Sequence, residues 1–391
     1  MLYQVKQFAQ DFEVEELLPE WVPSGNGDFL YIFFQKENLT TMEVVDYLTQ
    51  TFHLQREEIG IAWLKDKMWI TRQRISVSKS SLTKIWWQQL FIDELWKKVQ
   101  ILTISFHDIW LKVASNAWNK FKIFLRAKQP ISSEIKSQIE YNVYNIREKW
   151  FPNCFGMQRF GKWKKNFFEA KERLNFLADK LEENGKLLTE DLPYHLRFML
   201  QAYASMYFNE YVLNRWEKWL HLLQWDVVAD KYSSNWVNVA VYDSQKIYPF
   251  DYQKLKKEKS DYWIFMSEIS WEGLNMNSEK WFPTGPMLWW NLLVPCEWTK
   301  ARVRDNQIFE LAGFDESIQQ VCKIYGLWWV RRVLFVRVFD LKFGWVWNDI
   351  ALEFSLPTGS YATVMLAFVL EWIDELTLKD NSLVIPRISN N

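Results

Sequence analysis

Cysteine, histidine and glycine are all scarce in this chain of 391 residues, which contains 3 Cys, 4 His and 12 Gly. The cysteines are widely spaced and the histidines form no cluster, so we expect no zinc site and no other metal site. A sparse, odd number of cysteines is typical of proteins in a reducing compartment, which predicts a cytoplasmic protein.

Long apolar runs and a basic-then-apolar leader pattern are also missing. We therefore expect no membrane-spanning helix and no membrane partner. The net charge is −1, so an enzyme that acts on nucleic acid would have to gather its cations locally. Local clusters do occur at Lys162–Lys165, Lys254–Lys259 and Arg331–Arg337, and a solvated surface is the alternative explanation for each.

The spacing of apolar residues predicts strands in the first part of the chain, long helices in the middle and strands again near the end. Strands are predicted over 29–35, 59–62, 70–77, 99–104, 121–125, 333–339 and 350–354, and helices over 41–52, 132–148, 166–184, 193–215 and 359–373. The segment 226–326 is predicted to be irregular and rich in loops. This order predicts an α+β protein whose catalytic domain is built from both chain ends around an insertion.

The tripeptide Lys65-Asp66-Lys67 places one carboxylate between two lysines, and Thr71 and Gln73 follow it on a predicted strand. Flanking cations favour the ionised form of a carboxylate, and an ionised aspartate can act as a nucleophile. Taken alone, such a tripeptide more often marks a solvated turn with a surface ion pair.

Six further segments of the sequence, before and after this tripeptide, are informative when taken together with it. They are residues 11–15, 23–28, 36–41, 152–161, 201–209 and 355–363. Together with the tripeptide they closely resemble the TruD family of tRNA pseudouridine synthases, from about Phe12 to about Thr363. The Lys-Asp-Lys segment and the pattern Asn-x-Phe-Gly-x-Gln-Arg-Phe-Gly, which begins at Asn153, are the most specific.

The resemblance implies a pseudouridine-synthase core, a mixed or antiparallel sheet with helices, and an inserted family-specific α+β domain. The catalytic domain is expected at 1–165 and 327–391, and the inserted domain at 166–326. The resemblance implies tRNA as the partner and a reaction that needs no cofactor and no metal. We expect a monomer.

The resemblance also implies roles for individual residues. Asp66 is implied to be the nucleophile and uridine 13 of tRNA the target. Phe155 matches an aromatic residue beside the target base, and Asn153 a position that fixes the catalytic loop or the base edge, with a plain turn asparagine as the alternative. The other expected substrate-binding residues are Lys65, Lys67, Gln158, Arg159, Arg331 and Arg332, and Phe12, Glu15, Thr71 and Gln73 are expected to support the site from below.

Two other functions are compatible with the same sequence. One is a catalytically inactive module that binds RNA or helps tRNA to fold, and the other is the same chemistry on a different uridine. Because Asp66, Asn153 and Phe155 are all present, the active enzyme is favoured over the inactive module.

Tryptophan is in excess where glycine is short. Ordinary usage of about 7% would give roughly 27 glycines, whereas the chain has 12 Gly and 25 Trp. The family has glycine at seven positions that are tryptophan here: Trp63, Trp118, Trp150, Trp163, Trp225, Trp289 and Trp329. We hypothesise that the gene comes from a lineage that reads UGA as glycine, and that this translation read UGA as tryptophan; a genuinely tryptophan-rich protein is the alternative. Trp69 likewise stands where the family has a small residue.

Overall fold

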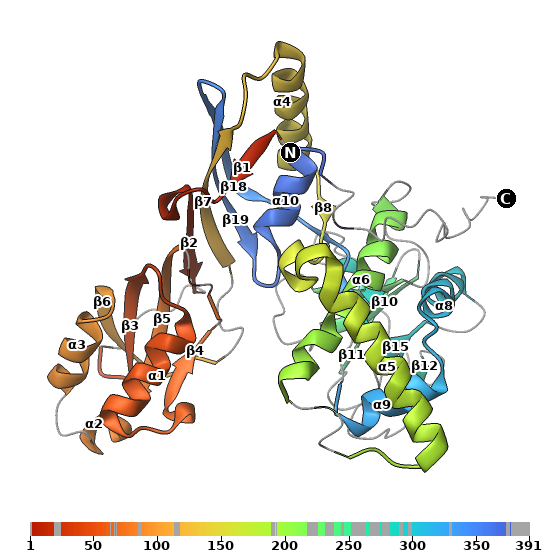
Figure 1. Ribbon diagram of the computed structural model, residues 1–391, viewed down its shortest axis with the longest axis horizontal. Coiled ribbons are helices and arrows are strands. Elements are labelled where there is room, and N and C mark those ends of the chain that lie inside the picture. The colour runs from red at the N-terminus through yellow and green to blue at the C-terminus, as the bar shows by residue number, and fades with distance from the viewer. Residues whose placement is uncertain are drawn as a thin grey trace. The chain divides into compact units, whose positions relative to one another are not determined.

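The computed structural model describes residues 2–18, 25–62, 64, 65, 67, 69–84, 88–112, 118–188, 192, 194–216, 226–230, 238–243, 246–251, 263–265, 274–275, 281–288, 292–295, 299–327, 331–372 and 376. The chain divides into two compact units, one formed by 1–148 with 337–359 and the other by 149–336 with 360–391. The elements of both units are labelled in Figure 1. The predicted division into catalytic and inserted domains concerns family boundaries and stays a prediction.

The first unit contains a nine-stranded sheet with the order β18-β19-β7-β2-β5-β3-β6, in which β1 also pairs with β7 and β4 with β5. The strands β2 and β5 run parallel, and their other neighbours run antiparallel to them. The nine strands are β1 (Tyr3–Val5), β2 (Phe12–Leu17), β3 (Phe29–Lys36), β4 (Ile59–Ile61), β5 (Ile70–Ser78), β6 (Gln100–His107), β7 (Trp118–Ala127), β18 (Phe339–Val346) and β19 (Asp349–Pro357).

Four helices accompany this sheet: α1 (Thr41–Phe52), α2 (Lys79–Lys84), α3 (Gln88–Trp96) and α4 (Ser133–Glu148). In Figure 1, α1 to α3 lie around β3 to β6, and α4 lies near β18. The helix α1 buries Val44, Val45 and Leu48 in a core that it shares with β3 and β5. The predicted strand 29–35 and helix 41–52 are confirmed, because apolar spacing and real burial coincide there.

Sequences from both chain ends meet in the middle of this sheet. The strand β7 pairs with β2 on one side and with β19 on the other, so that Phe121 lies opposite both Val14 and Phe354. The rings of Phe121 and Phe354 stack with their centroids 5.3 Å apart. The predicted α+β sheet core built from both ends of the chain is therefore confirmed.

The second unit combines helices with a six-stranded sheet of order β13-β11-β10-β9-β14-β16. Its helices are α5 (Lys165–Asn184), α6 (Tyr194–Trp216), α8 (Lys300–Ala312), α9 (Glu316–Ile324) and α10 (Ala362–Val369). Its strands are β8 (Phe151–Pro152), β9 (Val227–Asp230), β10 (Asn238–Asp243), β11 (Lys246–Asp251), β12 (Trp263–Phe265), β13 (Leu274–Asn275), β14 (Trp281–Pro286), β15 (Leu292–Val294), β16 (Arg331–Val333) and β17 (Phe335–Val336).

The prediction that 226–326 is irregular is wrong, since this segment holds seven strands and the helices α8 and α9. The helix α8 was hard to predict because two charged residues, Arg302 and Asp305, lie on its buried side, which weakens the apolar period of 3.6 residues. Among the described residues, no helix is both long and apolar enough to cross a membrane.

Two tryptophans occupy backbone positions that favour glycine. Trp163 has φ of 58° and ψ of 26°, and its side chain is 84% exposed. Trp347 has φ of 63° and is 91% exposed. Val346 pairs with Asp349, so Trp347 is the first residue of a two-residue hairpin loop, a place where glycine is preferred. Of the seven tryptophans at family glycine positions, Trp63, Trp225, Trp289 and Trp329 lie outside the described residues.

Candidate active site

The predicted site residues fall into two groups, one in each compact unit. The first group surrounds the loop between β4 and β5. Asp66 itself lies outside the described residues, but its neighbours Lys65 and Lys67 do not. The buried hydroxyl of Thr41 accepts a hydrogen bond from the Lys65 amide at 2.8 Å and donates one to Gln73 Oε1 at 3.0 Å. Thr41 thereby fixes the loop to the strand that follows it.

The two lysines of the tripeptide have different surroundings. The Lys65 ammonium donates a hydrogen bond of 2.6 Å to Asn119 Oδ1 on β7. The Lys67 ammonium is exposed and pairs at 2.6 Å with Glu43 in the first turn of α1. That hydrogen bond from Lys67, helped by those from the Thr40 amide and hydroxyl, lowers the pKa of Glu43 to about 2.

Thr40 and Glu43 form a capping box at the start of α1. The Thr40 hydroxyl accepts from the Glu43 amide at 3.0 Å, and the Glu43 carboxylate accepts from the Thr40 amide at 2.6 Å. Such a reciprocal pair satisfies two backbone donors that a helix start would otherwise leave open. The same carboxylate holds Lys67, so the helix start and the loop are braced together.

The strand β2 contributes the supporting residues. Phe12 is buried against Phe121 and against Trp69, whose ring centroid lies 5.9 Å away. Thr71 and Gln73 on β5 are buried as well. Glu15 does not lie beside Phe12: strand alternation turns it to the opposite face, where Arg72 is 3.9 Å away. The supporting role expected of Glu15 stays a prediction, and Glu16 occupies the face that Phe12 shares.

The second group begins with Asn153, whose polar groups are all engaged. Its amide donates to Leu334 O at 2.7 Å, and its side-chain nitrogen donates to Val333 O at 2.9 Å. Its carbonyl and Oδ1 accept from Arg332 at 3.0 and 2.8 Å. This arrangement favours the alternative of a structural asparagine over direct contact with a base.

Phe155 is held from two directions. The side chain of Asn209 on α6 accepts from the Phe155 amide at 2.7 Å and donates to its carbonyl at 3.0 Å. The Arg332 guanidinium lies 4.2 Å from the Phe155 ring centroid, within cation–π range. Burial, together with the nearby charge of Arg159, lowers the pKa of Arg332 to about 10. The Phe155 ring is only 1% exposed.

Tyr361 and Gln158 complete the surroundings of Phe155. The Tyr361 ring lies 5.8 Å from the Phe155 ring and is partly exposed, and the Gln158 side chain is exposed and accepts from Thr363 at 3.2 Å. Gly156 fits between them, because a Cβ there would lie 2.6 Å from Thr363 Oγ1 and 3.0 Å from Tyr361 Cδ1. Arg159 is partly buried, with its guanidinium 5.3 Å from the Phe155 ring.

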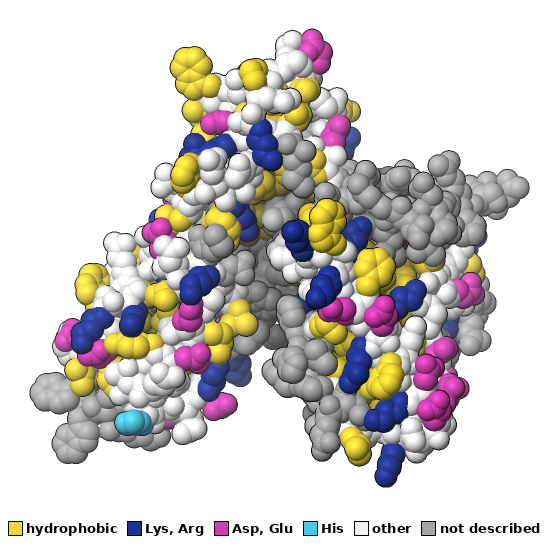
Figure 2. Space-filling model, viewed as in Figure 1, with side chains coloured by type: hydrophobic (Ala, Val, Ile, Leu, Met, Phe, Trp, Pro, Cys, Tyr) yellow, Lys and Arg dark blue, Asp and Glu magenta, His cyan; other side chains and the backbone are white. Residues whose placement is uncertain are grey.

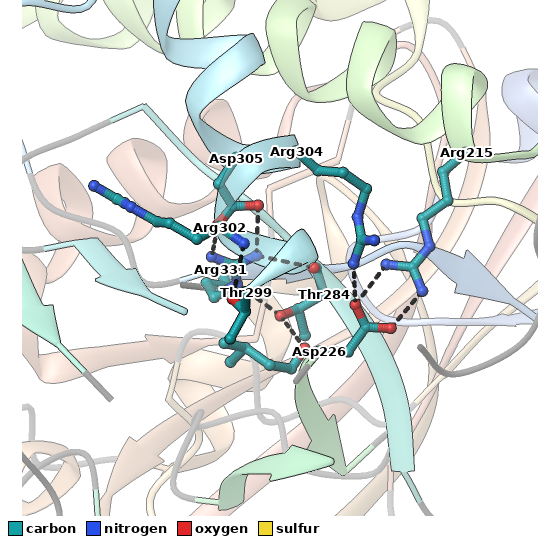
Figure 3. A network of polar contacts seen from close by, with 9 residues as sticks. Arg215, Asp226, Thr284, Thr299, Arg302, Arg304, Asp305 and Arg331 are labelled. Atoms are coloured by element: carbon teal, nitrogen blue, oxygen red, sulfur yellow. Dashed lines mark hydrogen bonds and ion pairs between the residues drawn. The ribbon is translucent and has the colours of Figure 1, made fainter. Parts of the chain in front are cut away.

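Arg331 is enclosed in a polar network of the second unit (Figure 3). It pairs with Asp305 of α8 at 2.6 Å and donates to the hydroxyl and carbonyl of Thr284 at 2.8 and 3.1 Å. Both Arg331 and Asp305 are almost completely buried. The guanidinium of Arg331 is thus occupied inside the unit, and its expected contact with substrate stays a prediction.

Charges of both signs are mixed on the surface of the described residues. In Figure 2, their lysine and arginine side chains are interspersed with acidic and hydrophobic side chains on the face shown. This agrees with the net charge of −1. Within the part of the chain that the structure describes, no three histidine, cysteine or acidic side chains are grouped as metal ligands.

Sequence reasoning missed Asn209, Asn119 and Glu16. Asn209 lies at the end of one of the blocks that carry the family resemblance, but nothing in the sequence connects it to Phe155, 54 positions away. Glu16 lies four residues after Phe12 on β2, which places both on one face, but no strand was predicted there from the sequence.

The fold has a close counterpart among solved structures. The crystal structure of the Methanosarcina mazei TruD protein superimposes with a TM-score of 0.59, covering 94% of this chain and 93% of that one at 17% identity. At this identity the likeness establishes the fold alone.

Comparisons of the sequence point to the same family as the structural match. The family model described as tRNA pseudouridine synthase D (TruD) matches residues 3–174. Proteins named tRNA pseudouridine synthase D are 25% identical in Thermus thermophilus, over 94% of this chain and 88% of that protein, and 27% identical in Wolinella succinogenes, over 92% of both. One from Sulfurimonas denitrificans is 31% identical over 55% of each chain. Residues 3–174 thus match the TruD family model, and the chain is similar to proteins named tRNA pseudouridine synthase D over more than 90% of its length.

Proposed function

We propose that the protein isomerises uridine 13 of tRNA to pseudouridine and that Asp66 is its nucleophile. Relatives named tRNA pseudouridine synthase D support the isomerisation of a tRNA uridine. The nucleophile and the target position rest on the sequence resemblance around the Lys-Asp-Lys tripeptide.

The anchoring of the loop on both sides of residue 66 carries this proposal. The Lys65 amide donates to Thr41 Oγ1, and the Lys65 carbonyl accepts from the Thr41 amide at 3.3 Å. Lys67 is held by Glu43. These contacts hold residues on either side of Asp66 in the sequence, and a fixed position is what a nucleophile needs. Its two cationic neighbours in sequence favour the ionised carboxylate.

The reaction is an isomerisation, so the atoms of the substrate balance without a co-reactant. The bond between N1 and C1′ of the uridine breaks, the detached base turns, and a bond between C5 and C1′ forms. A proton leaves C5 and one is taken up at N1. Asp66 would stabilise the nucleotide while the base is detached, and no electrons are gained or lost.

On the sequence resemblance, we assign the second group of residues to substrate binding. Phe155 is buried, so its proposed role is to shape the surface around it, with Asn153, Arg332 and Asn209 fixing its backbone and ring. Tyr361 is partly exposed and offers a base an aromatic ring. Stacking on such a ring is worth about 1–3 kcal/mol.

The test measures pseudouridine in a tRNA transcript before and after treatment with the enzyme. Asp66→Ala should abolish product while tRNA affinity stays within about threefold, because affinity comes mainly from phosphate contacts. Asp46→Ala, at an exposed position of α1, is the control and should leave both unchanged. A transcript with cytidine at position 13 should give no product.

The assay should use both the printed chain and a form with glycine at the seven family glycine positions. Product at another uridine would overturn the target assignment, and product from Asp66→Ala would overturn the nucleophile. If both forms bind tRNA and neither gives product, the proposed enzyme activity is wrong and the protein is an inactive RNA-binding module.

A further inference from the structure

A buried carboxylate with no assigned role lies close to the Lys-Asp-Lys loop. Glu16, on β2, has 0% of its surface exposed. One carboxylate oxygen accepts from the Arg74 amide at 3.1 Å. The other, Oε1, is also buried and has no hydrogen-bond partner among the described residues. A buried carboxylate is costly unless a charge or hydrogen bonds compensate it, so Glu16 needs a cation.

Lys65 supplies that cation. It interacts electrostatically with Glu16 and opposes the rise in the pKa of Glu16 that burial causes, as does Arg74. The strand register explains the proximity: Glu16 lies opposite Asn119 in the β2–β7 pair, and the Lys65 ammonium donates to Asn119 Oδ1 at 2.6 Å. The ammonium is thus directed towards two strands of the sheet.

Lys65 is therefore fixed at both ends of the residue. Thr41 holds its main chain through two hydrogen bonds, and Asn119 holds its side chain, which the Glu16 carboxylate also attracts. Attraction between charges is stronger in a buried setting than in water. An ammonium held in this way is poorly placed to follow RNA phosphates, but it lies next to Asp66 in the chain.

We propose that Glu16 is a positioning residue for the reaction, which with Asn119 fixes the ammonium of Lys65, the residue that precedes Asp66 in the chain. This inference rests on the proposed function, because it gives Lys65 a task only if Asp66 is the nucleophile. It changes the role of Lys65 from substrate binding to support of the nucleophile.

The experiment compares Glu16→Gln with Glu13→Gln, at a position on the opposite face of β2. Because positioning effects on chemistry run from about tenfold to a hundredfold, Glu16→Gln should lower kcat by at least about tenfold and change KM for tRNA by less than about twofold. Glu13→Gln should change neither by more than about twofold. A rise in KM with unchanged kcat in Glu16→Gln would overturn the proposal.

A double-mutant cycle separates positioning from simple structural support. If Glu16 acts through Lys65, Glu16→Gln should have no further effect on kcat when Lys65→Met is already present. Effects that multiply would overturn the proposal, as would a fall in the salt dependence of tRNA binding in Lys65→Met, since that would mark a phosphate contact. Should Glu16→Gln fail to fold, Asn119→Ala tests the same lysine, and its kcat loss must likewise vanish in Lys65→Met.

The two proposals fail in different ways. If the unsubstituted protein gives no pseudouridine, the proposed function fails. If it gives pseudouridine and Glu16→Gln does so at the same rate, the proposed function stands and the role of Glu16 is refuted.

Discussion

Replacing Trp163 and Trp347 by glycine should stabilise the protein. Both residues have positive φ, a conformation that costs an L-residue about 1–2 kcal/mol. Because their side chains are 84% and 91% exposed, removing them sacrifices little buried apolar surface. Glycine also increases the entropy of the unfolded chain, which lowers the stability by about 0.5–1 kcal/mol and offsets part of the gain. The expected net gain is about 0.5–1 kcal/mol at each position.

Scanning calorimetry can measure this gain. For units of this size, 1 kcal/mol corresponds to about 2–4 °C in Tm. Trp347→Gly should raise the Tm of the first unit and Trp163→Gly that of the second, and the effects should add because the positions lie in different units. Trp96→Gly is the control: Trp96 is also exposed but ends α3, where glycine costs about 0.5–1 kcal/mol.

Two separate results would refute the reasoning. If Trp163→Gly and Trp347→Gly lower Tm as much as Trp96→Gly does, the left-handed backbone does not select glycine. If the codons at 163 and 347 are UGG, codon reassignment does not explain these tryptophans. Peptide mass spectrometry of natively produced protein should find glycine at 163, and also at 347, a position that family comparison did not single out.

Two further predictions concern buried polar groups. Asn209→Asp removes the donors to the carbonyls of Phe155 and Leu376. At about 1–3 kcal/mol for each unpaired carbonyl, urea unfolding should show a free energy of unfolding lower by about 2–6 kcal/mol. Asn214→Asp, at a partly exposed position of the same helix, is the control and should change it little. In Asp11, hydrogen bonds from Arg126 and the Phe8 amide outweigh burial and hold the pKa of the carboxyl below 3.8. The ionised carboxylate therefore stabilises the fold fully above pH 3.8, and this stabilisation is lost as the pH falls through the lower pKa of the folded state. The free energy of unfolding should fall less steeply with acid in Asp11→Asn, and an unchanged curve would contradict this.

Local patterns in the sequence were enough to predict much of the first unit. The helix predicted over 132–148 is α4, Ser133–Glu148, because apolar residues at helical spacing are also the ones that become buried. On a strand, the alternation of side chains between the two faces would have distinguished Glu16 from Glu15. The resemblance pointed to the loop around Asp66, and the structure adds the side chains that hold it.

Long-range polar pairing could not be predicted in this way. The sequence does not show that Arg331 finds Asp305 or that Arg332 finds Asn153, 179 positions earlier. Both arginines look like cations for RNA when only their charge is considered. Their burial depends on how α8 and β16 pack, which no local pattern encodes.

The position of β7 has a consequence for synthesis on the ribosome. One side of β7 pairs with β2 soon after both are made, but its other partner, β19, begins only about 220 residues later. At about 5–20 residues per second, that edge stays open for roughly 10–45 s while the second unit emerges. An open strand edge invites pairing with other chains, and charged residues discourage it. Lys120, Lys122 and Arg126 along β7 would protect the nascent sheet during this interval.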